Sequence, residues 1–121
     1  MNKSLKPHLN PGEYVFVLTD NIYGVNEEDI LCSFKEDGKY SLILKKEFAN
    51  KYGMTYDFIA AWISLGLHSS LNSFGLTSLF SQALADNKIS CNVIAGFNHD
   101  HIFVDYDNRE KAFDILNKLK F

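Results

Sequence analysis

The order of apolar and turn-forming segments repeats once along this chain, and the repeat restricts the folds that it can adopt. From residue 58 the pattern predicts strand, helix, strand, strand and helix. From residue 13 it predicts strand, loop, strand, strand, short helix and strand. The two series match if the loop at 20–29 stands where a helix has been lost. We therefore predict an α+β fold: a duplicated ferredoxin-like βαββαβ unit whose first copy (1–60) lacks its first helix and shares one core with the second (61–121).

Several local signals support this order. Asp37-Gly38 between two apolar runs predicts a β-hairpin, because glycine accepts the positive φ of a tight turn. Apolar residues at helical spacing predict a helix over 76–86, and its stripe comprises Leu76, Leu79, Phe80, Ala83 and Leu84. Asn10-Pro11-Gly12 is typical of a turn. We also expect Asp107 or Asn108 to cap a final helix.

The composition limits the class of protein. The chain has 121 residues and a formal net charge of −3, and its basic residues form no cluster larger than a pair such as Lys45-Lys46. Binding to a phosphate backbone needs positive charge, so we expect no nucleic acid partner. The first residues are polar, and the longest apolar run is about half the length of a membrane span. We expect no membrane partner, a cytoplasmic location, and free thiols at Cys32 and Cys91.

The stretch from Ser90 to Val104 carries a thiol, amides, imidazoles and a carboxylate within one apolar segment. The favoured interpretation is a strand over 89–97, with Cys91, Val93, Ala95 and Phe97 on one face, followed by a polar turn at Asn98-His99-Asp100. One alternative is a metal site at His99 and His101. Zinc needs three or four ligands, and the spacing supplies two, so we expect neither metal nor cofactor.

A second alternative is a nucleophilic Cys91 with His68 as its base. Such a thiol needs a base within hydrogen-bond reach and a third group that orients the base. No triad spacing is present, and a thiol on an alternating apolar face ordinarily packs in the core. We therefore expect a protein without catalytic activity.

Three segments resemble an uncharacterised bacterial family of tandem ACT-like domain proteins. They are the opening Asn10-Pro11-Gly12-Glu13-Tyr14-Val15-Phe16, the segment His68-Ser69-Ser70-Leu71 with Gly75-Leu76-Thr77, and the stretch Ser90-Cys91-Asn92-Val93-Ile94-Ala95-Gly96-Phe97. The resemblance covers most of the chain and is weakest over 20–57. It implies a small-molecule sensor, with an amino acid as the expected class of ligand.

The resemblance also implies where the ligand binds: in the loop before the 76–86 helix, completed by the second strand of a neighbouring domain. The ligand-binding residues are then Asn72, Ser73, Phe74, Gly75, Leu76, Cys91 and Asn92. Gly75 allows close backbone approach, and a helix N-terminus offers free N–H groups to a carboxylate. Open sheet edges favour a homodimer. The alternative function is an interaction module that docks on a metabolic enzyme.

Overall fold

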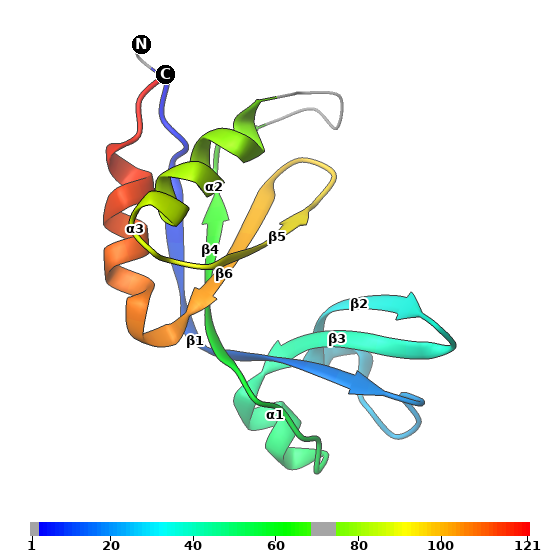
Figure 1. Cartoon of the computed structure of the whole chain (residues 1–121). Helices are drawn as coiled ribbons and strands as arrows, with labels where there is room; N and C mark the ends of the chain where they lie inside the picture. The colour runs from blue at the N-terminus through cyan, green and yellow to red at the C-terminus, as the bar shows by residue number, and fades with distance from the viewer. Residues whose placement is uncertain (1–2, 69–74) are drawn as a thin grey trace. The chain divides into compact units, whose positions relative to one another are not determined.

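The computed structural model of the protein describes residues 3–68 and 75–121 (Figure 1). Its strands are β1 (Pro7–Thr19), β2 (Ile30–Glu36), β3 (Lys39–Lys45), β4 (Ile59–Leu65), β5 (Cys91–Ala95) and β6 (Asp100–Asp105). Its helices are α1 (Lys46–Lys51), α2 (Leu76–Asp86) and α3 (Arg109–Lys118), with short 3₁₀ turns at Glu27–Asp29 and Tyr106–Asn108. The helix predicted over 76–86 is confirmed, and the strand predicted from residue 58 runs from Ile59 to Leu65.

The chain forms two compact units that do not follow the order of the sequence. The larger unit joins Met1–Pro11 to Ala61–Phe121, and the smaller unit is Gly12–Ala60. Strands β1 and β4 each begin in one unit and end in the other. The assignment of the two copies to residues 1–60 and 61–121 stays a prediction.

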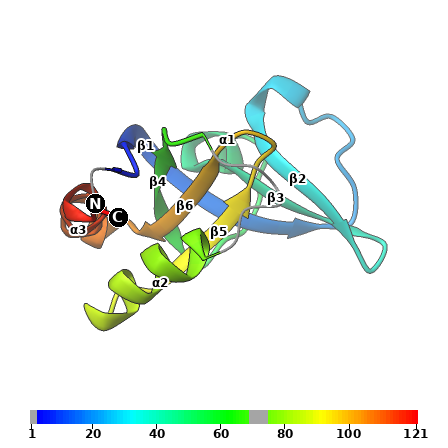
Figure 2. The ribbon, with the colours of Figure 1, turned by 90° about the horizontal axis from the view of Figure 1, so that it is seen from above.

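In the larger unit the strands lie in the order β1-β4-β6-β5, and α2 and α3 cover one face of them (Figure 2). No strand follows α3 in the described chain, so the N-terminal segment supplies the fourth strand of this unit. Gly66 N–H donates to the Lys6 carbonyl at 2.8 Å and Leu67 N–H to the Leu5 carbonyl at 3.1 Å. The core beneath the helices consists of Leu5, Ala61, Ile63, Leu65, Phe80, Leu84, Ile89, Ile102, Val104, Ala112 and Leu116.

Two details of the larger unit correct the sequence analysis. The strand predicted over 89–97 ends at Ala95, and the hairpin is closed by a hydrogen bond from Gly96 N–H to the His99 carbonyl. Phe97 lies in that turn with 81% of its surface exposed, so it does not share the buried face of Cys91. Neither predicted cap forms a side-chain cap on α3; instead, the Asp105 carboxylate accepts a hydrogen bond from Asp107 N–H in the preceding 3₁₀ turn.

The smaller unit is built on the antiparallel strands β2-β3-β1. The predicted β2–β3 hairpin is confirmed: Asp37 and Gly38 have φ of +51° and +76°, as a type I′ turn requires. The predicted turn at Asn10-Pro11-Gly12 is wrong, because these residues lie within β1 and Gly12 takes a φ of +105° there. Glycine adopts this backbone conformation without steric cost, so the strand continues through a signal that is typical of a turn.

A loop and one 3₁₀ turn occupy the place of the lost helix in this unit, as predicted. Tyr52, just after α1, holds the end of this loop. Its hydroxyl accepts from Asn26 N–H at 3.1 Å and donates to Asp29 Oδ2 at 2.5 Å, and Lys51 Nζ lies 3.3 Å from the same carboxylate. The hydrogen bond from Tyr52, and then the bond and charge of Lys51, hold the pKa of Asp29 below its ordinary value. The fold is thus a duplicated ferredoxin-like α+β fold with its first helix replaced.

Replacing Tyr52 with Phe removes the hydroxyl that joins Asn26 to Asp29. We expect the free energy of unfolding, measured in urea, to fall, since the Asn26 N–H loses its acceptor and the Asp29 carboxylate keeps only Lys51 among the described residues. Tyr56→Phe is the matched control, because it removes only an exposed hydrogen bond to Asn50. Equal stability of the two variants would show that Tyr52 does not hold the loop.

Candidate functional site

The corner that precedes α2 is the centre of the predicted site. Gly75 is the residue before the helix, with a φ of +90°, and a side chain added there would meet no atom of the described residues within 4 Å. Its carbonyl accepts hydrogen bonds from Leu79 N–H at 3.0 Å and Ser78 Oγ at 3.1 Å. Among the residues that the structure describes, no acceptor pairs with the backbone N–H groups of Leu76, Thr77 and Ser78. These groups concentrate positive potential at an exposed corner.

The remaining loop residues of the prediction, Asn72, Ser73 and Phe74, lie outside the described residues. Leu76 is half-buried and packs against the core of the larger unit. Gly75 and Leu76 are therefore placed as expected at the N-terminus of a helix, and the contribution of the loop stays a prediction.

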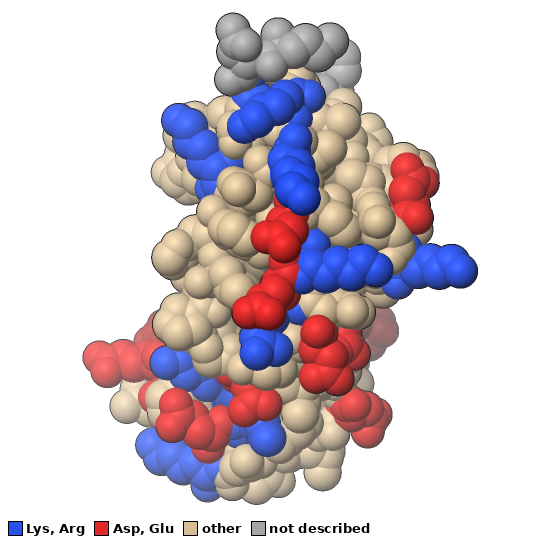
Figure 3. Space-filling view, turned by 90° about the vertical axis from the view of Figure 1, so that its left-hand side faces the viewer, with Lys and Arg blue, Asp and Glu red and all other residues tan. Residues whose placement is uncertain are grey.

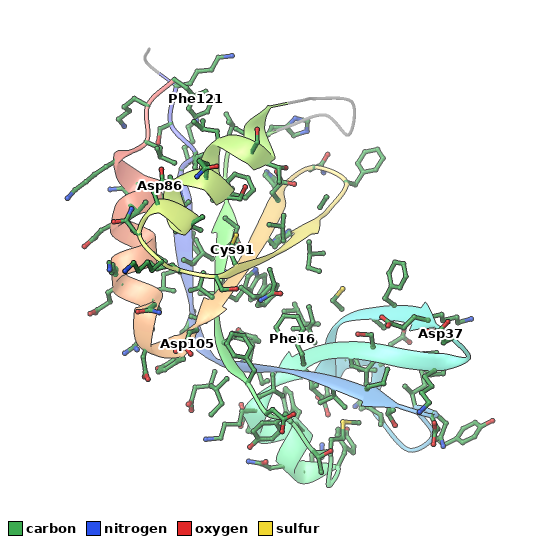
Figure 4. All side chains as sticks on the ribbon, viewed as in Figure 1. Phe16, Asp37, Asp86, Cys91, Asp105 and Phe121 are labelled. Carbon is green, nitrogen blue, oxygen red and sulfur yellow. The ribbon has the colours of Figure 1, made fainter. Side chains whose placement is uncertain are left out.

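The two predicted residues of β5 point to opposite faces of the sheet. Cys91 packs against the same core as Leu76, on the helix-covered face, and burial raises the pKa of its thiol (Figure 4). A protonated, packed thiol is a weak nucleophile. Asn92 is exposed and pairs in register with Phe103, on the face without helices. The structure thus brings Leu76 and Cys91 to one side of the sheet and leaves Asn92 on the other.

The helix-free face of the larger unit carries a hydrogen-bonded group that the sequence analysis misses. Asn10 Nδ2 donates to Ser64 Oγ at 2.8 Å and to the Trp62 carbonyl at 3.3 Å. Trp62 Nε1 donates to His101 Nδ1 at 3.1 Å, and the Trp62 ring stacks on Phe103 at 6.2 Å. The alternation of Trp62 and Ser64 with buried residues in β4 is the signal that could have revealed this face.

His68 and the imidazoles of the β5–β6 hairpin are the residues on which both alternative chemistries depend. His68 Nε2 lies 3.1 Å from Asn98 Oδ1, and the His68 ring lies edge-on to His99 at 5.9 Å. Within the described ranges, no group of three or more histidine, cysteine or acidic side chains is placed to hold a metal ion. His68 is thus engaged with the β5–β6 turn rather than with Cys91, the nucleophile of the other alternative.

Burial of the His101 ring predicts that the stability of the larger unit depends on pH. The Trp62 N–H needs a lone pair on His101 Nδ1, which the neutral ring supplies. Burial, and then the neighbouring His99, lower the pKa of His101 below 6.5, whereas Asp100 opposes the shift. The unfolded chain therefore binds this proton more readily, and stability falls as the pH decreases from above 6.5 through the lower pKa of the folded state.

His101→Asn tests this dependence, because the asparagine Oδ1 takes the position of the imidazole Nδ1 and keeps an acceptor for Trp62, but the side chain does not titrate. We expect urea unfolding of this variant between about pH 5 and pH 8 to vary less with pH than that of the original chain, with similar stability at the upper end. Identical pH profiles for the two chains would assign the dependence to other groups.

Comparison with protein-family models decides the class of the chain. Residues 1–61 match one ACT domain model, and residues 58–118 match another. The chain belongs to the ACT domain family. ACT domains are in general regulatory domains that bind small molecules, and nothing in the described part of the chain shows catalytic activity. No curated protein matches the chain.

Solved structures show the same tandem fold. A protein of unknown function from Vibrio cholerae, described as a possible transport protein, is 34% identical, with a TM-score of 0.89 over 98% of this chain and 92% of its own. An Agrobacterium tumefaciens protein is 16% identical, with a TM-score of 0.76 over 94% of this chain and 87% of its own. Aspartokinase α and β subunits are 13% identical, with a TM-score of 0.65 over 96% of this chain and 97% of the matched chain.

The last two structures show the fold alone.

In the described ranges of this ACT protein, every helix is too short or too polar to cross a membrane.

Proposed function

We propose that this ACT protein is a regulatory protein that binds a small polar metabolite, such as an amino acid, and has no catalytic activity of its own. The observation that carries the proposal is the exposed corner at Gly75, where three successive backbone N–H groups of α2 have no acceptor among the described residues. Such groups bind carboxylates and phosphates. Membership of the ACT family supports a small-molecule ligand.

The proposed site keeps the predicted residues. The free N–H groups of α2 hold the carboxylate of the ligand, and Gly75 allows it to approach the backbone closely. Asn72, Ser73 and Phe74 would complete the loop, and Cys91 and Asn92 would contribute from β5. Because these two side chains point to opposite faces, only one of them can contact a given ligand with its side chain. We propose that the exposed Asn92 contacts the ligand with its side chain, and that it does so across the interface of a homodimer. The protein acts in the cytoplasm.

A calorimetric titration with a panel of amino acids tests the proposal, and Thr77→Glu is its decisive variant. Thr77 is exposed in the first turn of α2, where a carboxylate interacts favourably with the helix dipole. The variant should therefore fold, yet bind a carboxylate ligand at least about tenfold more weakly, since the added charge competes for the same N–H groups.

Ala85→Glu is the matched control, because it adds the same charge near the other end of α2. We expect it to bind the ligand as the original chain does. Equal loss of binding in both variants would indicate a general effect of charge, and unchanged binding in Thr77→Glu would remove the ligand from this corner.

The alternative function, an interaction module that docks on a metabolic enzyme, depends on open sheet edges. Each unit ends in such an edge: β2 in the smaller unit and β5 in the larger unit. If no amino acid binds and the chain captures a peptide, this alternative gains support over the sensor.

A further inference from the structure

A surface groove of the larger unit lies away from the proposed ligand site, between the first part of β1 and α3. It encloses about 560 Å³ and is lined by Pro7, His8 and Leu9 from the strand and by Glu110, Phe113 and Asp114 from the helix. Leu9 and Phe113 are half-buried at the rim of the core, so the floor of the groove is apolar. The groove therefore combines a strand, an apolar floor and a helix with acidic side chains.

The strand side of this groove is an open edge of the sheet. In the larger unit β1 is the end strand, next to β4, and the described pairs of β1 with β3 run only from Tyr14 to Thr19. An unpaired edge presents backbone N–H and C=O groups to another extended chain. Pro7 and Pro11 have no N–H, so the usable edge is the short stretch His8–Asn10. The edge can accept a few residues of a partner, which limits the affinity.

The helix side of the groove sets the charge of its occupant. Glu110 and Asp114 lie four residues apart and hence on the same side of α3. Neither carboxylate forms an ion pair within the described residues. Figure 3 looks onto the side of the molecule that carries α3 and shows acidic side chains gathered between basic ones. The groove therefore favours a ligand with a single positive charge over a ligand with several consecutive basic residues.

We propose that this groove binds an extended peptide segment of a partner protein by strand addition to His8–Asn10, with a lysine or arginine directed at Glu110 and Asp114. Peptides can add as an extra strand to a sheet edge that lies beside a helix. The backbone hydrogen bonds provide affinity, and alternate side chains of the peptide provide specificity. Among the described residues, no buried side-chain nitrogen or oxygen lacks a hydrogen-bond partner, so the groove holds no buried polar atom that waits for a small molecule. The proposal is independent of the metabolite site.

The test uses the full chain and short capped peptides of alternating threonine and valine with one central lysine. We expect the lysine peptide to shift the amide resonances of His8, Leu9 and Asn10 and of the α3 residues from Glu110 to Asp114 in a ¹H–¹⁵N spectrum. A peptide with glutamate in place of lysine should bind more weakly. A lysine peptide with N-methylated alternate amides should not bind, because it cannot form the backbone bonds of strand addition.

The double variant Glu110→Gln, Asp114→Asn should weaken binding of the lysine peptide by about two- to thirtyfold, the range expected for two exposed ion pairs. Glu36→Gln, an exposed residue of the smaller unit, is the control and should leave binding unchanged. The proposal is overturned if the shifted amides lie elsewhere, if the N-methylated peptide binds equally well, or if the lysine peptide does not bind.

Discussion

Leu5→Ala is expected to lower the free energy of unfolding of this ACT protein by about 2–5 kcal/mol, the range for a large-to-small change in a closed core. Leu5 has no exposed surface and lies in the core formed by residues from 61 onwards, although it is more than fifty residues distant from them in the chain. This loss of stability has two causes: methyl groups are no longer buried, and a cavity remains in their place. Urea unfolding followed by circular dichroism measures it.

Leu18→Ala is the matched control for this variant. Leu18 belongs to the same strand, β1, but has 59% of its surface exposed and lies in the smaller unit. Its replacement should change stability by no more than about 0.5 kcal/mol. If Leu5→Ala were as mild as Leu18→Ala, the N-terminal segment would not be part of the larger unit.

Phe80→Ala is expected to have the largest effect, a loss of about 3–5 kcal/mol. Phe80 is fully buried and, with Leu84, attaches α2 to the sheet of the larger unit. Gly75 and the N–H groups without a described acceptor belong to the start of this helix, so a loosened α2 should also weaken the binding of any ligand that they hold. The variant therefore links the stability of the core to the binding corner.

Gln82→Ala separates the two effects of that change. Gln82 is exposed on the same helix and, among the described residues, donates to Asp86 alone. Its replacement should therefore change stability and ligand binding little. Denaturant unfolding and titration of both variants measure the contrast. A Phe80→Ala chain with nearly unchanged stability would contradict the packing described for α2.

Much of this fold can be predicted from local pattern. Helix α2 follows from apolar residues at helical spacing, and the β2–β3 hairpin follows from Asp37-Gly38, because the spacing and the backbone freedom that decide them lie within a few neighbouring residues. The origin of the fourth strand of the larger unit cannot be found in this way. Its pairing joins Lys6 to Gly66, and no local pattern records a partner at that separation.

The candidate site was predictable in part for the same reason. The resemblance to ACT-like proteins directs attention to the Gly75 corner, where the structure begins α2, and the alternation of β5 places Cys91 and Asn92 on opposite faces. The bond between Trp62 and His101 spans 39 residues and depends on the order β4-β6 in the sheet. Only the assembled sheet brings these two side chains together.

The most direct test of the central claim is a titration of the full chain with an amino acid, in which the backbone amide resonances are monitored by NMR. Our account predicts that an amino acid which raises the melting temperature also shifts the amides of Leu76, Thr77 and Ser78, because its carboxylate accepts hydrogen bonds from them. An amino acid that binds while these three amides stay unchanged, or a full panel that produces no binding, would contradict it.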